Sequence, residues 1–262
     1  MAAELRLLSF NVRFGRYAGA RLTAAGEQIE NERIDVVVLQ EVMHRAQVKR
    51  LQRVLTSFPH SVSHRTGPMV RAGLVIFSRW PVERQDLLSF GRAAARPSLD
   101  QWLKPKGALI VHLRVDNHPV VIIDTHLQHN PLGNWSHVNR YTAREQFELQ
   151  RLAGAIGKLS SDSSLVVAGD FNVPAGSWLL DEFLASTGLR DAMGPSREPT
   201  YNKTSRVRNP QAIDHVLVRQ GRGTALAVAA KLVFRNDRVQ ISGSRTVELS
   251  DHCAILATVS LS

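Results

Sequence analysis

The sequence predicts an α/β protein, because short β-branched runs alternate with amphipathic helical stretches along the chain. A length of 262 residues with 44% hydrophobic content supplies the material for a sizeable core. No internal repeat, low-complexity tract or linker rich in Gly, Ser and Pro interrupts the alternation. We therefore expect one domain over residues 1–262 and, by default, a monomer.

Eight apolar runs predict strands, and four stretches with helical periodicity predict helices. The predicted strands are Leu5–Val12, Asp35–Leu39, Gly73–Phe77, Ala108–Val115, Val120–Thr125, Leu165–Ala168, Ile213–Val218 and Ala254–Val259. The predicted helices are Arg21–Arg33, Arg45–Leu55, Arg140–Leu159 and Trp178–Ser186. In the third helix, Leu149, Leu152 and Ile156 belong to the apolar face, and Glu145 and Glu148 are expected outside it. Two long loops, Gly91–Lys106 and Gln128–Asn139, are candidates for function.

The chain is strongly basic, with 33 Lys and Arg against 23 Asp and Glu and a formal net charge of +10. A positive field of this size attracts polyanions such as nucleic acid or an anionic membrane surface. The alternative is a general preference for Arg on every surface, because the Arg residues are spread along the chain. Charge alone does not choose between these interpretations.

The one cysteine, Cys253, excludes an intramolecular disulfide, so nothing points to an oxidising compartment. No run has the apolar length of a membrane span, and the first residues lack the pattern of a signal peptide. These features lead us to expect a soluble cytoplasmic protein. Cys253 opens an apolar strand, so it is predicted to be a small buried hydrophobe and not a nucleophile.

Polar side chains of catalytic type stand next to most of the predicted strand ends. They are Asn11, Gln40, Glu41, Asp124, His126, Asp170, Asn172, Asp214, His215, Asp251 and His252. Buried strands open onto a common edge of their sheet, so these side chains are expected to converge. Together they offer carboxylates, carboxamides and imidazoles, which suit a hard divalent cation and acid–base chemistry.

This inventory fits the hydrolysis of a phosphate ester. A phosphodiester repels an incoming hydroxide, and a cation on a phosphoryl oxygen offsets that repulsion. Magnesium prefers oxygen ligands and often needs only one or two carboxylates, which Glu41 with Asn11 could supply. Zinc is disfavoured because the chain has no Cys-rich or HExxH-type cluster.

Six segments resemble the ordered motifs of the endonuclease/exonuclease/phosphatase superfamily, the DNase I-like proteins. They are Ser9-Phe10-Asn11, Leu39-Gln40-Glu41, Thr125-His126-Leu127, Gly169-Asp170-Phe171-Asn172, Ile213-Asp214-His215 and Ser250-Asp251-His252. They occur in the family's order and span most of the chain. The resemblance implies a four-layer α/β/β/α sandwich, with two packed, mainly antiparallel or mixed sheets flanked by helices. It also implies a phosphoesterase that depends on Mg²⁺, with Mn²⁺ as an alternative.

The resemblance also implies which residues hold the metal. Glu41 would be the principal metal ligand, with Asn11 beside it and Asp251 nearby. Taken alone, each has a structural alternative, since Asn11 could cap a loop by bonding its own backbone.

The same resemblance assigns catalytic roles. Asp170 would activate or orient the attacking water, and Asn172 would hold the scissile phosphate or a ligand of the metal. His126 and His252 would donate to phosphate oxygens, and Asp214 would orient His252 through the far ring nitrogen. The structural alternative for Asp170 and Asn172 is a turn after a strand.

Four further histidines, His44, His129, His137 and His215, match no motif position and are predicted to be solvated loop residues. No carboxylate partner for His126 can be assigned from the sequence.

Two stretches resemble neutral sphingomyelinase-like members of the superfamily. One is Ala72–Pro81, and the other runs from Thr125 through Trp135 to the helix around Glu145. Trp102 with Lys106-Gly107 is a looser match to the same branch. A loop carrying Trp135 could insert into a lipid interface, or the indole could fold down onto the protein.

Other substrates and a non-catalytic role stay open at this point. A DNA or RNA nuclease would use the basic charge, and the Arg197–Arg208 segment around Tyr201 could line a groove for phosphates. An inositol- or nucleotide-phosphate phosphatase is equally compatible with the motifs. A non-catalytic phosphate-binding module is disfavoured, because Glu41, Asp170 and His252 are all retained.

Overall fold

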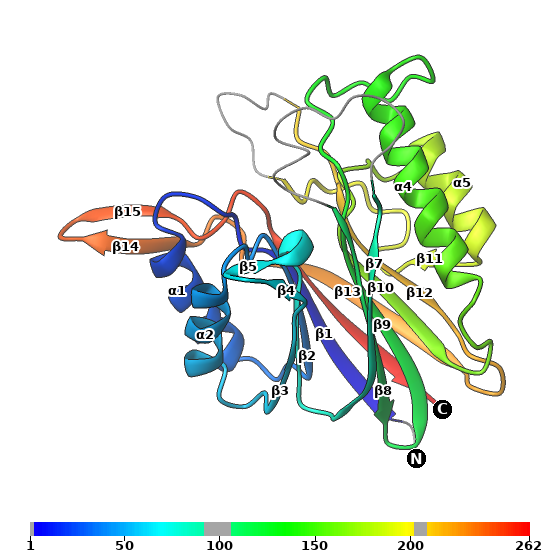
Figure 1. Ribbon diagram of the computed structural model, residues 1–262, viewed down its shortest axis with the longest axis horizontal. Coiled ribbons are helices and arrows are strands. Elements are labelled where there is room, and N and C mark those ends of the chain that lie inside the picture. Colours follow the sequence, from blue (N-terminus) through cyan, green and yellow to red (C-terminus); the bar gives the residue numbers. More distant parts are fainter. Residues whose placement is uncertain (1–2, 92–105, 202–208) are drawn as a thin grey trace.

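The computed structural model describes residues 3–91, 106–201 and 209–262, whose strands form two six-stranded sheets (Figure 1). In order, the first sheet contains β13 (Leu226–Val233), β16 (Ala254–Leu261), β1 (Ala3–Asn11), β2 (Val36–Gln40), β6 (Val75–Ser78) and β3 (His60–Val62). The second contains β11 (Arg190–Asp191), β12 (Asp214–Arg219), β10 (Ser164–Asp170), β9 (His118–His126), β8 (Gly107–Val115) and β7 (Val82–Ser89).

Within the described ranges, four α-helices cover the outer faces of the two sheets (Figure 1). The first sheet carries α1 (Ala18–Glu30) and α2 (Arg45–Val54), and the second carries α4 (Arg140–Ile156) and α5 (Trp178–Thr187). Two short hairpins complete the described structure, β4 (Arg65–Thr66) with β5 (Met69–Val70) and β14 (Arg238–Ser242) with β15 (Arg245–Glu248). The β4–β5 hairpin leads into a 3-10 turn, η1 (Arg71–Gly73).

Alternation along the central strands produces the four layers. In β1, Leu5 and Leu7 point into the core between the sheets, whereas Leu8 and Phe10 point toward α1 and α2. The strand β10 does the same, with its even-numbered apolar residues between the sheets and its odd-numbered ones against α4 and α5. Because side chains of a strand alternate between its faces, strands apolar on both faces need cover on both sides. The predicted α/β/β/α sandwich is confirmed.

Strand direction brings distant residues to one edge. The strands β1 and β2 are parallel, and so are β9 and β10, so Asn11, Gln40, His126 and Asp170 lie at strand ends that face the same way. The neighbours β12 and β16 run antiparallel to these strands and therefore begin at that edge, with Asp214 paired to Asp170. We call this edge of the two sheets the site edge.

Gly169 allows β10 to approach β9 closely just before Asp170. Its φ is +141°, and a Cβ at this position would lie 2.0 Å from the carbonyl oxygen of Thr125. Only glycine adopts this conformation without strain and leaves room for the neighbouring backbone. The backbone that presents Asp170 thus depends on the glycine before it.

All eight predicted strands and all four predicted helices are present, and no predicted end differs from the observed one by more than three residues. The missed strands lie mainly at sheet edges or in short hairpins, where half-exposed residues give weak alternation. None of the helices in the described ranges is long and apolar enough to cross a lipid bilayer.

The predicted placement of Glu145 and Glu148 outside the buried face of the third helix is wrong, because both side chains are fully buried. Glu148 accepts hydrogen bonds from the backbone of Gln128 at 2.7 Å and from Arg144 at 2.7 Å. Burial raises the pKa of Glu145 to about 9, so this carboxyl is protonated at neutral pH. The two acids anchor the loop that follows β9, a role that helical periodicity cannot reveal.

Candidate active site

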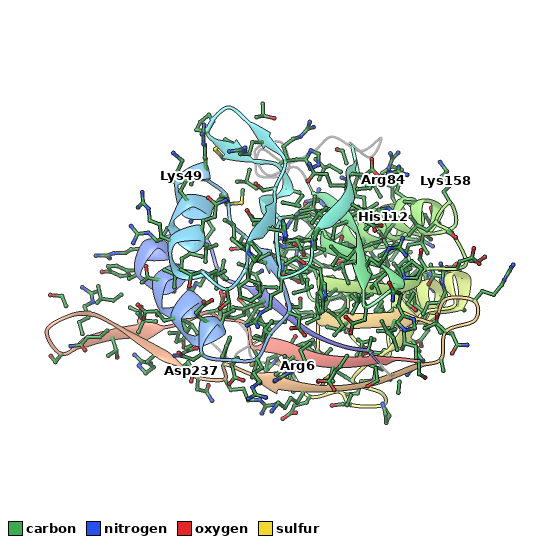
Figure 2. The ribbon with its side chains drawn as sticks, turned by 90° about the horizontal axis from the view of Figure 1, so that it is seen from below. Arg6, Lys49, Arg84, His112, Lys158 and Asp237 are labelled. Atoms are coloured by element: carbon green, nitrogen blue, oxygen red, sulfur yellow. The ribbon has the colours of Figure 1, made fainter. Side chains whose placement is uncertain are left out.

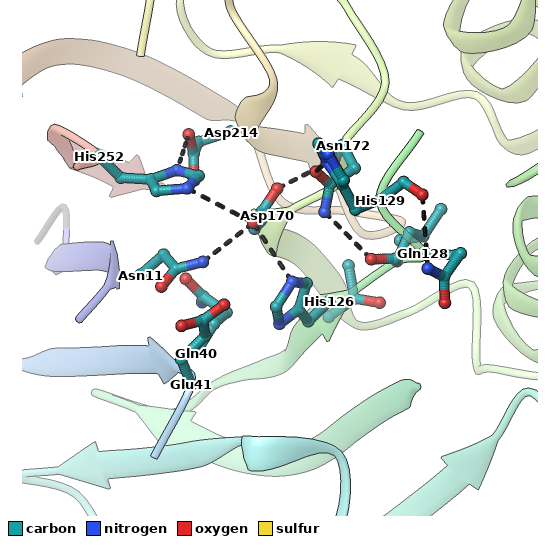
Figure 3. Close-up of polar contacts among 12 residues, drawn as sticks. Asn11, Gln40, Glu41, His126, Gln128, His129, Asp170, Asn172, Asp214 and His252 are labelled. Carbon is teal, nitrogen blue, oxygen red and sulfur yellow. Dashed lines mark hydrogen bonds and ion pairs between the residues drawn. The ribbon is translucent and has the colours of Figure 1, made fainter. Parts of the chain in front are cut away.

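Asp170 is the centre of a buried polar cluster at the site edge (Figure 3). Its Oδ2 accepts a hydrogen bond from Nδ2 of Asn11 at 2.9 Å and lies 3.3 Å from Nε2 of His126. Nε2 of His252 lies 3.8 Å from the same oxygen. Burial alone would raise the pKa of Asp170, but the two imidazoles outweigh it and hold that pKa below its ordinary value. Asp170 is therefore an ionised carboxylate enclosed by donors from three other strand ends.

His252 is held from behind by Asp214. Nδ1 of His252 lies 2.9 Å from Oδ2 of Asp214, so Nε2 faces Asp170 (Figure 3). Oγ1 of Thr200 donates to the same Asp214 oxygen at 2.6 Å, and the ring of Tyr201 packs edge-on against His252. This is the carboxylate–imidazole arrangement that fixes ring orientation in catalytic triads. Neither Thr200 nor Tyr201 lies in a motif, so these contacts could not be predicted from the sequence.

The two imidazoles have opposite protonation preferences. Burial works against a charged His252, but Asp214 and Asp170 more than compensate and raise its pKa to about 10. Burial and the nearby Lys106 lower the pKa of His126, with Asp170 opposing them. At neutral pH the site therefore offers one cationic imidazole at His252 and one neutral imidazole at His126.

Asn172 lies on the turn that follows β10 and fixes the other oxygen of Asp170. Its backbone N–H donates to Oδ1 of Asp170 at 3.0 Å, and its side-chain amide donates to the carbonyl of Leu127 at 3.1 Å. Asn172 has a positive φ of 54°, a conformation that Asn tolerates better than most residues. His129, predicted as a solvated loop residue, is exposed but also contacts Oδ1 of Asn172 at 3.2 Å.

Glu41 and Asn11 present oxygen atoms beside this cluster (Figure 3). Glu41 has a positive φ of 66°, and its Oε2 accepts the backbone N–H of Phe14 at 2.5 Å. Oδ1 of Asn11 accepts the backbone N–H of Arg13 at 3.0 Å. A φ in this region is uncommon for a residue other than glycine, and such strain is typical of functional sites.

Two sets of donors in the described residues could hold a cation. One is Glu41 with Asn11, whose carboxylate and amide oxygens are the ligands that magnesium prefers. The other is Asp170, Asp214 and His252, whose ligand atoms lie within 4.8 Å of one another. Members of the second set already bond each other, whereas the half-exposed Glu41 is open to a hydrated ion. The residues present thus fit a hard divalent cation.

Asp251, the third predicted metal ligand, contacts a guanidinium group. Its Oδ2 lies 3.4 Å from Nε of Arg13 and 3.5 Å from the hydroxyl of Tyr201. The structure therefore places Asp251 at the rim of the cluster, with a cation already beside it.

Two of the predicted solvated histidines are instead structural. His215 is buried, with Nε2 2.8 Å from the carbonyl of Val173 and Nδ1 3.2 Å from Asp191, so the prediction for it is wrong. His44 is half-buried and caps α2, which a motif comparison could not reveal. The prediction for His137 is confirmed, because its ring is exposed and stacks on Trp178.

Trp135 folds down onto the protein instead of projecting from its loop. Its ring packs against the core beneath α4 and α5, and its carbonyl accepts a hydrogen bond from the indole of Trp178 at 2.8 Å.

Cys253 is buried as predicted. Trp102, Lys203, Arg206 and Arg208 lie outside the described residues, so the predicted basic groove of Arg197–Arg208 is described only at Arg197 and Tyr201.

Comparison with known proteins agrees with this geometry. The model of the Endonuclease/Exonuclease/phosphatase family matches residues 8–252. The chain therefore belongs to this family, a class of phosphoric ester hydrolases with the DNase I-like fold.

One curated protein is similar over most of this chain. An inositol phosphosphingolipids phospholipase C of Schizosaccharomyces pombe is 29% identical over 203 residues, which cover 72% of this chain and 45% of that protein. The chain thus matches less than half the length of this curated relative.

Solved structures share the fold at lower identity. SmcL has a TM-score of 0.77 at 19% identity, covering 97% of this chain and 98% of its own. A variant of beta toxin from Staphylococcus aureus with bound magnesium ions has a TM-score of 0.74 at 16% identity, covering 97% and 99%. Sequence identities this low establish the shared fold alone.

Proposed function

We propose that this protein is a magnesium-dependent phosphodiesterase that hydrolyses the head-group phosphodiester of a phospholipid of the sphingolipid type. The observation that supports this most directly is the ionised Asp170, enclosed by His126, His252 and Asn11 at the site edge. An anionic base, a cationic donor and oxygen ligands for a hard cation are the groups that this reaction needs.

The chain's own residues account for the proton transfers. Asp170 orients the attacking water and takes its proton as the new P–O bond forms. His252, cationic and fixed by Asp214, donates a proton to the leaving oxygen as the old P–O bond breaks. His126 and Asn172 position phosphoryl oxygens by hydrogen bonding. Magnesium held by Glu41 and Asn11 would polarise a phosphoryl oxygen and offset the charge of the diester.

The choice of a lipid substrate has two supports. The matched relative is by name a phospholipase that acts on inositol phosphosphingolipids. Among the described residues, the large hydrophobic side chains that are most exposed are Phe14, Met69, Leu132 and Val138. Phe14, Leu132 and Val138 lie on loops that follow strands of the site edge, and Met69 lies in the β4–β5 hairpin, which bridges to His44 just after β2. A lipid surface would meet the protein there. Trp135, which is partly buried against the core, does not contribute to this surface.

The test is a substrate panel with either magnesium or a chelator. Inositol phosphosphingolipid and sphingomyelin vesicles are compared with supercoiled plasmid, using Glu41→Gln and its matched control Glu27→Gln, an exposed residue of α1. We expect lipid cleavage that requires magnesium, falls about 100-fold or more in Glu41→Gln and is retained in Glu27→Gln. Cleavage that proceeds in the chelator would overturn the metal dependence.

A nuclease is the second candidate, because the net charge of +10 would attract nucleic acid. The labelled basic side chains are nevertheless distributed over three places: Arg6, Lys49, and the neighbouring Arg84 and Lys158, which line one pocket (Figure 2). A single basic groove would favour nucleic acid more strongly. Plasmid nicking without lipid cleavage would replace the lipid proposal with this one.

We also propose that residues 1–262 act as one domain, because the N-terminal strand β1 pairs with the C-terminal strand β16 over seven positions. Limited proteolysis tests this: a stable fragment that lacks either strand would contradict it.

A further inference from the structure

A basic pocket of about 460 Å³ adjoins the candidate active site. It lies between the loop after β1, the first turn of α1 and the β14–β15 hairpin (Figure 1). Four arginines line it, Arg13, Arg16, Arg21 and Arg238, against a single carboxylate from Glu248. A surplus of guanidinium groups in one concave site is the arrangement that binds phosphate.

Arg21 is the most unusual of the four, because its side chain is buried while its charge is poorly compensated. The residue is only 5% exposed, and its Nε has no hydrogen-bond partner. Its Nη2 donates only to the backbone carbonyl of Arg13 at 3.0 Å. Burial and the nearby charge of Arg13 lower the pKa of Arg21, and Asp251 and Glu41 only partly oppose them. An anion in the pocket would relieve this repulsion.

The two exposed arginines of the pocket, Arg16 and Arg238, contact neutral groups. These contacts fix their positions and leave their positive charges uncompensated. Arg238 donates to Oγ1 of Thr246 at 2.9 Å and to its carbonyl at 3.3 Å. The guanidinium of Arg16 lies over the ring of Tyr17, 4.8 Å from its centroid. The helix α1 adds to the field, since its first turn contains no acidic residue and no side chain caps its N-terminus.

Arg13 and Phe14 join this pocket to the active site. The backbone N–H of Arg13 donates to Asn11, and its side chain lies 3.4 Å from Asp251. The next residue, Phe14, donates its backbone N–H to Glu41. The pocket therefore lies beyond Glu41 and Asn11 as seen from the scissile phosphate. A group bound in the pocket would belong to the part of the substrate that extends in that direction.

We propose that this arginine pocket binds a second, phosphate-like anion carried by the substrate's head group, and that it selects against cationic head groups such as choline. The proposal rests on the proposed function for its substrate, but the pocket's affinity for an anion can be measured without turnover. Like-charge repulsion between four guanidinium groups and a quaternary ammonium gives the selectivity, and bidentate arginine contacts give the affinity.

The kinetic test uses three water-soluble diesters that share the glycerophosphoryl group and carry anionic, neutral and cationic head groups: glycerophosphoinositol 4-phosphate, glycerophosphoinositol and glycerophosphocholine. We expect kcat/KM to fall in that order for the wild-type protein. In the double variant Arg16→Gln/Arg238→Gln, the ratio of kcat/KM for the first to the third should fall by about tenfold or more. Both arginines are exposed, so the substitution is compatible with folding. The matched control is Arg151→Gln, an exposed arginine on α4 that should retain the wild-type ratio.

The binding test titrates inorganic phosphate into the metal-free protein by calorimetry. We expect the double variant to bind phosphate about tenfold more weakly than the Arg151→Gln control. A variant that binds phosphate as tightly as the control would overturn the pocket's assignment, whatever the protein hydrolyses. So would an unchanged substrate ratio in a protein that cleaves these diesters.

The two tests separate the pocket from the proposed function. Phosphate binding that depends on Arg16 and Arg238, in a protein that hydrolyses no diester, would support the anion site and contradict the phosphodiesterase. Diester hydrolysis by a protein whose phosphate binding does not depend on these arginines would support the phosphodiesterase and contradict the anion site.

Discussion

The residues around Asp170 show how strongly a catalytic group depends on neighbours that do not touch the substrate. Thr200 donates to Asp214 at 2.6 Å and accepts the backbone N–H groups of Ile213 and Asp214 at 3.0 Å each. Asp214 in turn fixes the ring of His252. Thr200 is therefore a positioning residue that acts through two others.

Replacing the hydroxyl of Thr200 tests whether this residue positions His252 through Asp214. We expect Thr200→Val to lower kcat about tenfold or more with little change in KM, because a hydrogen bond to a charged group contributes about 1.5–3 kcal/mol. Steady-state kinetics on a soluble diester measures it, with Thr66→Val in the exposed β4 strand as the control. A change confined to KM would contradict the positioning role of Thr200.

A second residue-scale prediction concerns Asp124, which lies between the sheets and is fully buried. Its Oδ1 accepts Nε2 of Gln40 at 2.7 Å, but Oδ2 has no hydrogen-bond partner. Burial raises the pKa of Asp124 well above its ordinary value. The unfolded chain therefore ionises at lower pH than the folded one, and stability is lost as pH rises above the unfolded-state pKa.

We accordingly expect Asp124→Asn to be more stable than the wild-type protein at pH 7, with the difference shrinking toward pH 3. Thermal unfolding across this range measures the effect. An advantage that is greater at pH 3 than at pH 7 would have the wrong sign for a buried, neutral Asp124.

At the scale of single elements, the end of β10 is tightly constrained at Gly169. Gly169→Ala would place a methyl group 2.0 Å from the carbonyl oxygen of Thr125 at a φ of +141°. We expect a loss of about 3 kcal/mol or more in the free energy of unfolding. Gly154→Ala is the matched control, because that position in α4 has open space and alanine favours helix by about 0.5–1 kcal/mol. Urea unfolding of both variants measures the difference, and equal stabilities would contradict the close approach.

The elements also show what the sequence could and could not predict. The central strands were predictable because their apolar runs, such as Val36–Leu39 in β2, are buried on both faces. The edge strand β13 was not, because apolar residues occupy its exposed as well as its buried positions, so its sequence shows no alternation between polar and apolar residues. Glu145 looked solvent-facing from helical periodicity, yet it contacts Asn130 in the loop that folds back over the start of its own helix.

The same division holds for the candidate site. Asp170, His126 and His252 could be named from the sequence because their motifs resemble a known family. Their contacts required the fold: His126 and Asp170 meet through the parallel register of β9 and β10. Thr200 and the pocket around Arg21 carry no local motif, so only the packing of distant segments reveals them.

At the scale of the whole molecule, the exposed apolar side chains near the site edge predict contact with a lipid surface. Leu132 is 66% exposed and Val138 is 95% exposed, both on the loop between β9 and α4. We expect Leu132→Ser/Val138→Ser to bind vesicles about tenfold more weakly, since burying each side chain contributes about 1–2 kcal/mol. Vesicle sedimentation measures this, and turnover of a soluble diester serves as the control. Unchanged vesicle binding would remove the support that this loop gives to a lipid substrate.

The role of Asp170 unites the fold, the site and the proposed reaction, and one substitution tests it most directly. The rate of diester hydrolysis at saturating magnesium should be measured for Asp170→Asn and for Asp162→Asn, an exposed residue before the same strand. We expect Asp170→Asn to lose about 1,000-fold or more in kcat while remaining folded, and Asp162→Asn to retain the wild-type rate. A folded Asp170→Asn protein that keeps its rate within about threefold would contradict the central role of Asp170.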